Sequence, residues 1–87
     1  MLFYPSKISK NEGFFLVSFR DYYGEEPVTQ GKTYEEALDM AADWLLSAAI
    51  IAKEKQEELP QPSQAKNGEL LIEMPELADI KPGLLNS

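Results

Sequence analysis

The spacing of apolar and polar positions changes along the chain and predicts strands first and a helix afterwards. Residues 2–8, LFYPSKI, are aromatic and β-branched enough for a strand, and residues 14–19, FFLVSF, alternate between two faces. The turn sequence SKNEG between them predicts an antiparallel hairpin. Pro5 favours an edge position or a bulge for the first strand, because proline has no N–H to donate to a neighbouring strand.

A helical period begins near Thr33. Before it, residues 20–27, RDYYGEEP, read as a polar loop, and Val28 with Thr29 reads as a short third strand. Trp44 lies beside the apolar stripe of the predicted helix, which then ends in the polar residues 53–58 before two prolines. The stripe itself consists of Leu38, Ala41, Leu45, Ala48 and Ala52.

A last strand is predicted at residues 69–74, ELLIEM, which can return to the sheet by a crossover connection. The resulting fold class is α+β, a small β-β-β-α-β domain in which an antiparallel hairpin sheet is covered by one long helix. We assign this domain to residues 1–75 and a C-terminal tail to residues 76–87.

The small size of the chain predicts association. A core built from 87 residues rarely supplies more than roughly 3–5 kcal/mol, so we expect a homodimer or another partner that completes the burial. Met40, Leu46 and Ile50 fall off the helical stripe and widen the apolar surface. A broad core and a contact with a second chain both explain this widening, and the sequence leaves the two open.

The acidic composition points to a basic protein partner. Fifteen acids against eight bases give a net charge of −7, which repels phosphate backbones and argues against direct nucleic-acid binding by this chain. The start of the chain lacks the long apolar stretch of a signal peptide, and the most apolar run, residues 44–52, is too short to span a bilayer. We therefore expect a cytoplasmic protein without a membrane partner.

Catalytic machinery is sparse in this sequence. The absence of cysteine and histidine excludes thiol nucleophiles, imidazole bases and the usual zinc ligands. Asp21, Glu25 and Glu26 are the acids with a position suited to metal binding, yet they lack the spacing of a metal-binding loop. A solvated loop explains them better, and we predict no catalytic residue, metal or cofactor.

Two groups of residues are candidates for binding a partner. Glu35, Asp39 and Asp43 are spaced by four, which places them along the outer side of the helix, either as a solvated face or as a docking surface for a basic protein. Tyr22 and Tyr23 are predicted to be exposed in the loop, where they either anchor a partner or pack over the strand ends.

The stretch TQGKTYEEAL, residues 29–38, predicts how the helix starts. Gly31 is expected to allow a tight turn out of the third strand, and Thr33 with Glu36 forms a capping box of the form T-x-x-E. Glu35 and Glu36 also favour the positive end of the helix dipole. Of these two adjacent acids, only Glu35, which is aligned with Asp39, remains available for a partner.

Three segments together resemble the N-terminal domain of the HicB-type antitoxins: LFYPSKISKNEGFFLVSFRD, TQGKTYEEAL and LPQPS, in this order. The resemblance implies a domain similar to a reduced ribonuclease H fold without its catalytic carboxylates. It also implies an antitoxin of a type II toxin-antitoxin system, which binds a small, basic HicA-like toxin. Such toxins cleave messenger RNA, and the antitoxin blocks their active site.

The sequence departs from this family pattern in two places. Where the family commonly has a loop similar to Pro-Asp-Leu-Pro-Gly, residues 20–24 read RDYYG. The DNA-binding domain that usually follows is not expected in this chain, so operator binding is not assigned to it. The fold resemblance also leaves an alternative, a vestigial or metal-dependent ribonuclease H-like nuclease that uses Asp21 with Glu25 or Glu26.

Overall fold

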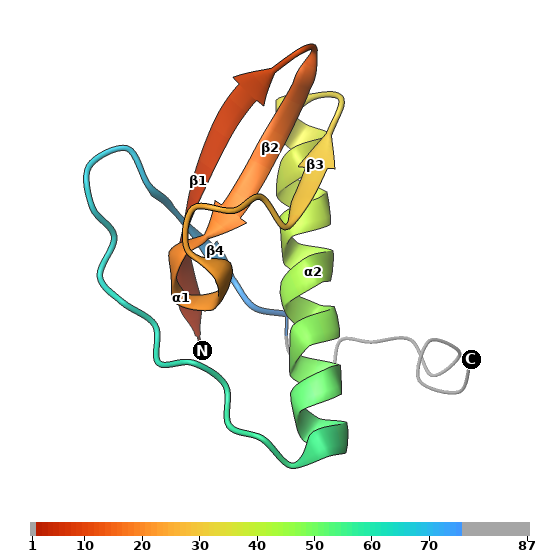
Figure 1. Ribbon diagram of the computed structural model, residues 1–87, viewed down its shortest axis with the longest axis vertical. Coiled ribbons are helices and arrows are strands. Elements are labelled where there is room, and N and C mark those ends of the chain that lie inside the picture. The colour runs from red at the N-terminus through yellow and green to blue at the C-terminus, as the bar shows by residue number, and fades with distance from the viewer. Residues whose placement is uncertain (1, 76–87) are drawn as a thin grey trace.

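A computed structural model describes residues 2–75, in which four antiparallel strands and one long helix form the β-β-β-α-β arrangement that the sequence predicts (Figure 1). A four-residue helix, α1, follows the second strand. The elements are β1 (Phe3–Asn11), β2 (Phe14–Phe19), α1 (Arg20–Tyr23), β3 (Thr29–Gly31), α2 (Tyr34–Lys55) and β4 (Leu70–Glu73). The tail assigned to residues 76–87 lies outside the described residues.

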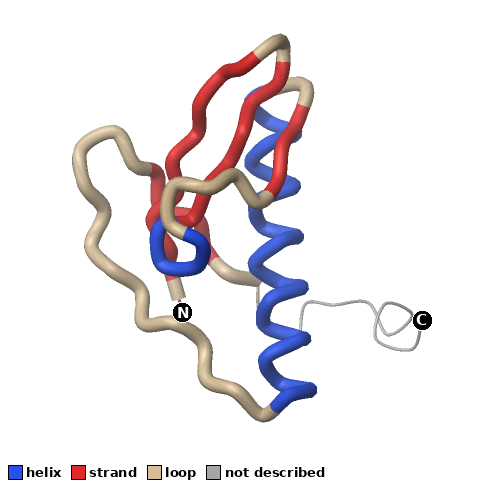
Figure 2. The backbone as a smooth tube through the Cα atoms, viewed as in Figure 1, coloured by secondary structure: helices blue, strands red, loops and turns tan. Residues whose placement is uncertain are grey.

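The sheet has the strand order β3-β2-β1-β4, and every neighbouring pair is antiparallel (Figure 2). The predicted hairpin is confirmed, but the edge position predicted for the first strand is wrong, since β1 lies between β2 and β4. Pro5 is tolerated there because the pairing with β2 begins only at Ser6. At Pro5, β1 therefore pairs with β4 alone, through Leu71.

Helix α2 begins and ends where the sequence predicts. The N–H of Glu36 donates to the Thr33 hydroxyl at 3.0 Å, and the Glu36 carboxylate accepts from the N–H of Lys32 at 3.2 Å. The capping box is thus present, with the carboxylate reaching one residue further back than the usual box. Gln56, in the left-handed region at φ 57°, ends the helix.

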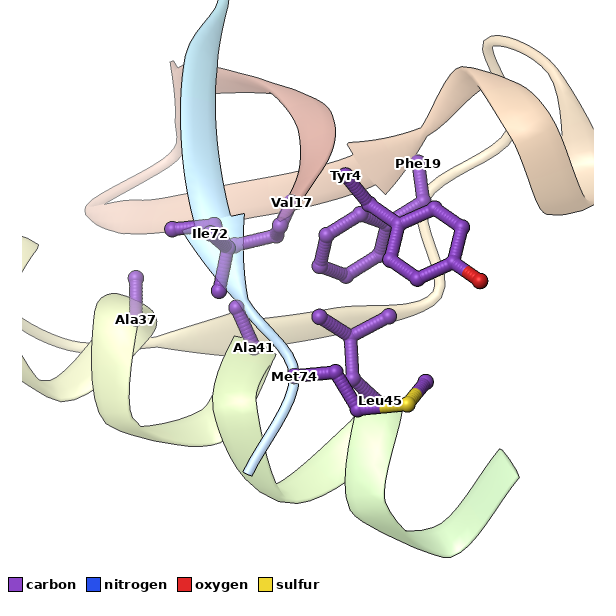
Figure 3. Close-up of a cluster of buried hydrophobic side chains, with 8 residues drawn as sticks. All are labelled: Tyr4, Val17, Phe19, Ala37, Ala41, Leu45, Ile72 and Met74. Carbon is purple, nitrogen blue, oxygen red and sulfur yellow. The ribbon is translucent and has the colours of Figure 1, made fainter. Parts of the chain in front are cut away.

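The core lies between the sheet and one face of α2. Ala37, Ala41 and Leu45 follow each other at intervals of four and point toward the inner face of the sheet (Figure 3). Small side chains at two of these positions let the helix approach the strands closely. The strands contribute Tyr4, Val17, Phe19 and Ile72 to this cluster, and Met74, which follows β4, completes it.

The apolar residues of α2 other than Ala37, Ala41 and Leu45 are only partly buried. Leu46 and Ile50 are half-buried, whereas Met40 is 41% exposed and Ile51 is 50% exposed. An apolar margin of α2 therefore stays in contact with solvent.

A long connection joins α2 to β4 and crosses from one edge of the sheet to the other. It leaves the far end of α2, passes on the side of α1 and returns as β4 next to β1 (Figure 1). Side chains from β1 hold both ends of it: the Tyr4 hydroxyl donates to the carbonyl of Pro60, and the Ser6 hydroxyl donates to the carbonyl of Leu70, both at 2.8 Å. The connection is therefore fixed to the sheet although it contains no helix or strand of its own.

Candidate functional site

The segment predicted as a polar loop, residues 20–27, begins with helix α1, and this part of the prediction is wrong. The reason lies in contacts with the distant connection between α2 and β4. The Asp21 carboxylate accepts two hydrogen bonds from Ser63, one from its N–H at 2.8 Å and one from its hydroxyl. Gly24, at φ 67°, then ends the helix.

Arg20 and Glu69 form the ion pair that holds the start of β4 to α1. The guanidinium donates to both carboxylate oxygens, at 2.9 and 3.1 Å, and also to the carbonyl of Gln64 at 2.8 Å. The two hydrogen bonds from Arg20 to Glu69, together with the N–H of Lys66, lower the pKa of Glu69 to about 2. Glu69 raises the pKa of Arg20 in turn.

Tyr22 packs inside an aromatic cluster instead of standing exposed. Its ring lies 5.1 Å from that of Tyr4 and 4.9 Å from that of Trp44, measured between centroids, and the Trp44 indole stacks on Phe19 at 5.6 Å. The Tyr22 hydroxyl is buried without a hydrogen-bond partner among residues 2–75, and burial raises the pKa of Tyr22. Tyr23, by contrast, is 66% exposed.

A groove of about 520 Å³, here called the aromatic groove, lies between α2 and the connection that follows it. Its lining comprises Tyr22, Tyr23 and Trp44, the last turns of α2 including Ile51, and residues 57–60. The ring of Tyr23 stands 6.1 Å from that of Trp44 and nearly perpendicular to it. The groove therefore presents aromatic and aliphatic surface to solvent, next to charged residues at the helix end.

Glu35, Asp39 and Asp43 form an acidic stripe along α2, and all three are exposed. None of them pairs with a base among the residues that the structure describes, where the ion pair is that between Arg20 and Glu69. Because side chains four apart project from one side of a helix, the three carboxylates lie along one side of α2.

Comparison with known proteins identifies the family. The family model described as "HicB_like antitoxin of bacterial toxin-antitoxin system" matches residues 3–82. The chain belongs to this HicB-like family. It is 39% identical over 84 residues to the protein named Antitoxin HicB 2 of Photorhabdus laumondii subsp. laumondii, which covers 97% of this chain and 58% of that protein.

A second curated relative gives the same result. The chain is 40% identical over 76 residues to the protein named Antitoxin HicB of Escherichia coli (strain K12), covering 87% of this chain and 54% of that protein. The chain thus spans somewhat more than half the length of these HicB relatives.

The carboxylates considered for a nuclease differ in their surroundings in this HicB-like domain. Both oxygens of Asp21 are engaged by Ser63, while Glu25 and Glu26 are exposed. Within residues 2–75 no three potential ligands gather as a metal site would need. The arrangement therefore gives the nuclease alternative no support. In the same part of the chain, no helix is both long and apolar enough to cross a membrane.

The structure brings together some of the predicted site residues and separates others. Tyr22 and Tyr23 meet at the aromatic groove, whereas the acidic stripe follows a different side of α2, because Asp43 and Trp44 are neighbours about 100° apart around the helix axis. Sequence reasoning missed that residues 57–60 line a groove, because it took residues 53–58 as the polar end of the helix and LPQPS only as part of the family pattern. Leu59, an apolar residue after a polar run, was the available signal.

Proposed function

We propose that this chain is an antitoxin that neutralises a HicA-like, mRNA-cleaving toxin by binding it directly and covering its active site. The acidic stripe carries the proposal: three exposed carboxylates without an ion-pair partner among the described residues, in a chain of net charge −7. Complementary charge accelerates encounter with a basic partner and fixes its orientation. Membership of the antitoxin family supports the same conclusion.

In this proposal residues 1–75 form the toxin-binding domain. Glu35, Asp39 and Asp43 supply charge complementarity, and Tyr23 contacts the toxin as an exposed aromatic anchor. Tyr22 supports the groove indirectly, because its ring packs against that of Trp44 and so holds Trp44 in position. The domain works by stoichiometric occlusion in the cytoplasm, without catalysis and without contacting nucleic acid itself.

We further propose that the chain forms a homodimer through the outer edge of β4. Within the described residues β4 is the last strand of the sheet on that side, so its outer N–H and C=O groups are unpaired. Exposed apolar side chains are present at β4 and at the start of β1, namely Leu2, Phe3, Leu70 and Leu71. Two copies related by a two-fold axis can pair these edges and bury this apolar surface.

The decisive experiment is a titration of toxin activity. A purified HicA-like toxin is incubated with a messenger RNA and increasing amounts of this chain, and the uncut RNA is quantified. We expect inhibition that is complete near equimolar protein, as occlusion requires. Cleavage that continues unchanged at excess chain would sink the proposal. The chain alone, with and without Mg²⁺, should leave the RNA intact.

A further inference from the structure

The aromatic groove offers exposed aromatic and aliphatic surface, which the acidic stripe lacks. Tyr23 is 66% exposed beside Trp44, so ring surface is open to a partner group, and aromatic faces attract cations. Ile51, 50% exposed, adds aliphatic surface. An occupant that combines an apolar stem with a cationic head would use both kinds of surface.

The charges around the groove favour a cation. Glu57 and Glu58 line it, and both are exposed and form no ion pair within residues 2–75. The groove also adjoins the C-terminal end of the 22-residue helix α2, where the helix dipole is negative. Lys55 is the one base in the lining and opposes these three contributions. The two carboxylates and the helix end outweigh it.

We propose that the aromatic groove binds an arginine side chain of the basic protein partner. The inference rests on the proposed function, which supplies that partner. A guanidinium stacks on aromatic rings and donates paired hydrogen bonds to a carboxylate, whereas an ammonium group offers a point charge. A purely apolar side chain would gain nothing from Glu57 and Glu58. Arginine is therefore the side chain that uses rings, aliphatic wall and carboxylates together.

The aromatic groove and the acidic stripe lie on different sides of α2, and the helix surface between them is exposed to solvent. Glu36 and Glu54 lie between them around the helix and are exposed, as is Ser47, which lines the groove on this side. One partner surface lying along this part of α2 can therefore contact both sites. The acidic stripe attracts the partner, and the aromatic groove binds one of its arginine side chains.

The chain has a single tryptophan, so a ¹⁵N-labelled sample gives one indole N–H signal, that of Trp44, in the groove. Unlabelled, catalytically inactive HicA-like toxin should shift this signal. The double variant Glu57→Lys/Glu58→Lys should weaken toxin binding at least about tenfold. Tyr23→Ala should weaken it as well. The matched control Glu25→Lys/Glu26→Lys has the same net charge but lies outside the groove, and it should change affinity less than about threefold.

The outcomes separate the two proposals. If the toxin binds the wild type but leaves the Trp44 signal in place, or if both double variants lose affinity equally, the groove proposal is wrong and the proposed function stands. If the wild type binds no toxin, the proposed function fails and the groove proposal fails with it.

Small probes test the chemical class of the occupant. N-acetyl-arginine amide at millimolar concentration should shift the Trp44 signal, and its neutral isostere N-acetyl-citrulline amide should not. Equal shifts with both probes would overturn the assignment to a cation. A shift that depends only on the concentration of the chain would assign the groove to a second copy, and a shift caused by substitutions within residues 76–87 would assign it to the chain's own end. Either result would overturn the proposal.

Discussion

Gly31 lies so close to Ala37 that a Cβ at position 31 would stand 2.4 Å from the Ala37 backbone nitrogen and 2.8 Å from its Cα. The turn expected at Gly31 is therefore the wrong explanation for this glycine. Gly31 is the last residue of β3, and its φ lies outside the left-handed region. It is required because β3 and the first turn of α2 make backbone contact, and the acidic stripe begins in that turn.

Substitution Gly31→Ala should destabilise the domain, because a methyl group forces β3 and α2 apart. We expect a loss of about 1–3 kcal/mol in the free energy of unfolding, typical of overpacking, measured by urea denaturation with Trp44 fluorescence. Gln30→Ala on the same strand is the control, since Gln30 is exposed, and it should change stability by less than about 0.5 kcal/mol. Equal stability of the two variants would show that the contact is not tight.

The cap of α2 gives a second stability prediction. Thr33→Ala removes the acceptor of the Glu36 N–H and should cost about 0.5–2 kcal/mol. Thr33→Ser keeps the hydroxyl and should retain most of the stability. The comparison is made by thermal unfolding followed by circular dichroism. If the serine variant loses as much as the alanine variant, the hydroxyl does not cap the helix.

The features that the sequence predicted depend on local signals. The hairpin follows from the alternation of its strands and the turn between them. The start of α2 follows from the capping box at Thr33, and its end follows from the polar residues 53–58. Each of these signals lies within a few residues of the feature it predicts. Acidic side chains spaced by four could likewise be placed on one side of α2 from their spacing alone.

The features that it missed depend on contacts between distant residues. Helix α1 is held by a pair 42 residues apart, Asp21 and Ser63, and the end of the connection by a pair 64 residues apart, Ser6 and Leu70. The aromatic groove has the same origin, because residues 57–60 reach Tyr23 only through the fold. Nothing in the local pattern around Tyr22 distinguishes an exposed loop from a short helix with its ring buried.

The ion pair between Arg20 and Glu69 should make stability fall in acid. The pKa of Glu69 is about 2 in the folded chain, below its ordinary value of 4.5, so the folded state binds its proton less readily than the unfolded state. The stabilisation is therefore fully present above about pH 5 and lost as the pH falls toward about 2. The difference in unfolding free energy between wild type and Glu69→Gln should shrink across this window. In an Arg20→Gln background the same comparison should lose most of its pH dependence, and a persistent dependence would assign the effect to another group.

Dimerisation through β4 predicts a specific disruption. Leu71→Lys places a charge beside the outer edge of that strand, where Leu71 is 47% exposed, and should shift the chain to monomer by raising the dimer dissociation constant at least about tenfold. Sedimentation equilibrium measures the shift. Met40→Lys, a comparably exposed position on α2, is the control and should leave the dimer intact. A monomeric wild type, or equal loss in both variants, would remove β4 as the interface.

The acidic stripe should govern how fast the toxin associates. Replacing Glu35, Asp39 and Asp43 together by lysine reverses the local charge, so the association rate at low salt should fall by at least about tenfold and its dependence on ionic strength should flatten. The measurement is stopped-flow or surface-based kinetics over a range of salt concentrations.

Two comparisons isolate the stripe from other effects of these substitutions. Replacing Glu12, Glu25 and Glu26 by lysine produces the same net charge at exposed positions off α2 and off β4. This control should slow association far less, because steering depends on where the charge lies as well as on its sum. A neutral variant, Glu35→Gln/Asp39→Asn/Asp43→Asn, avoids placing lysine at the positive end of the helix and should give an intermediate rate. If the two lysine triples slow association equally, net charge steers the toxin and the stripe is an ordinary solvated face.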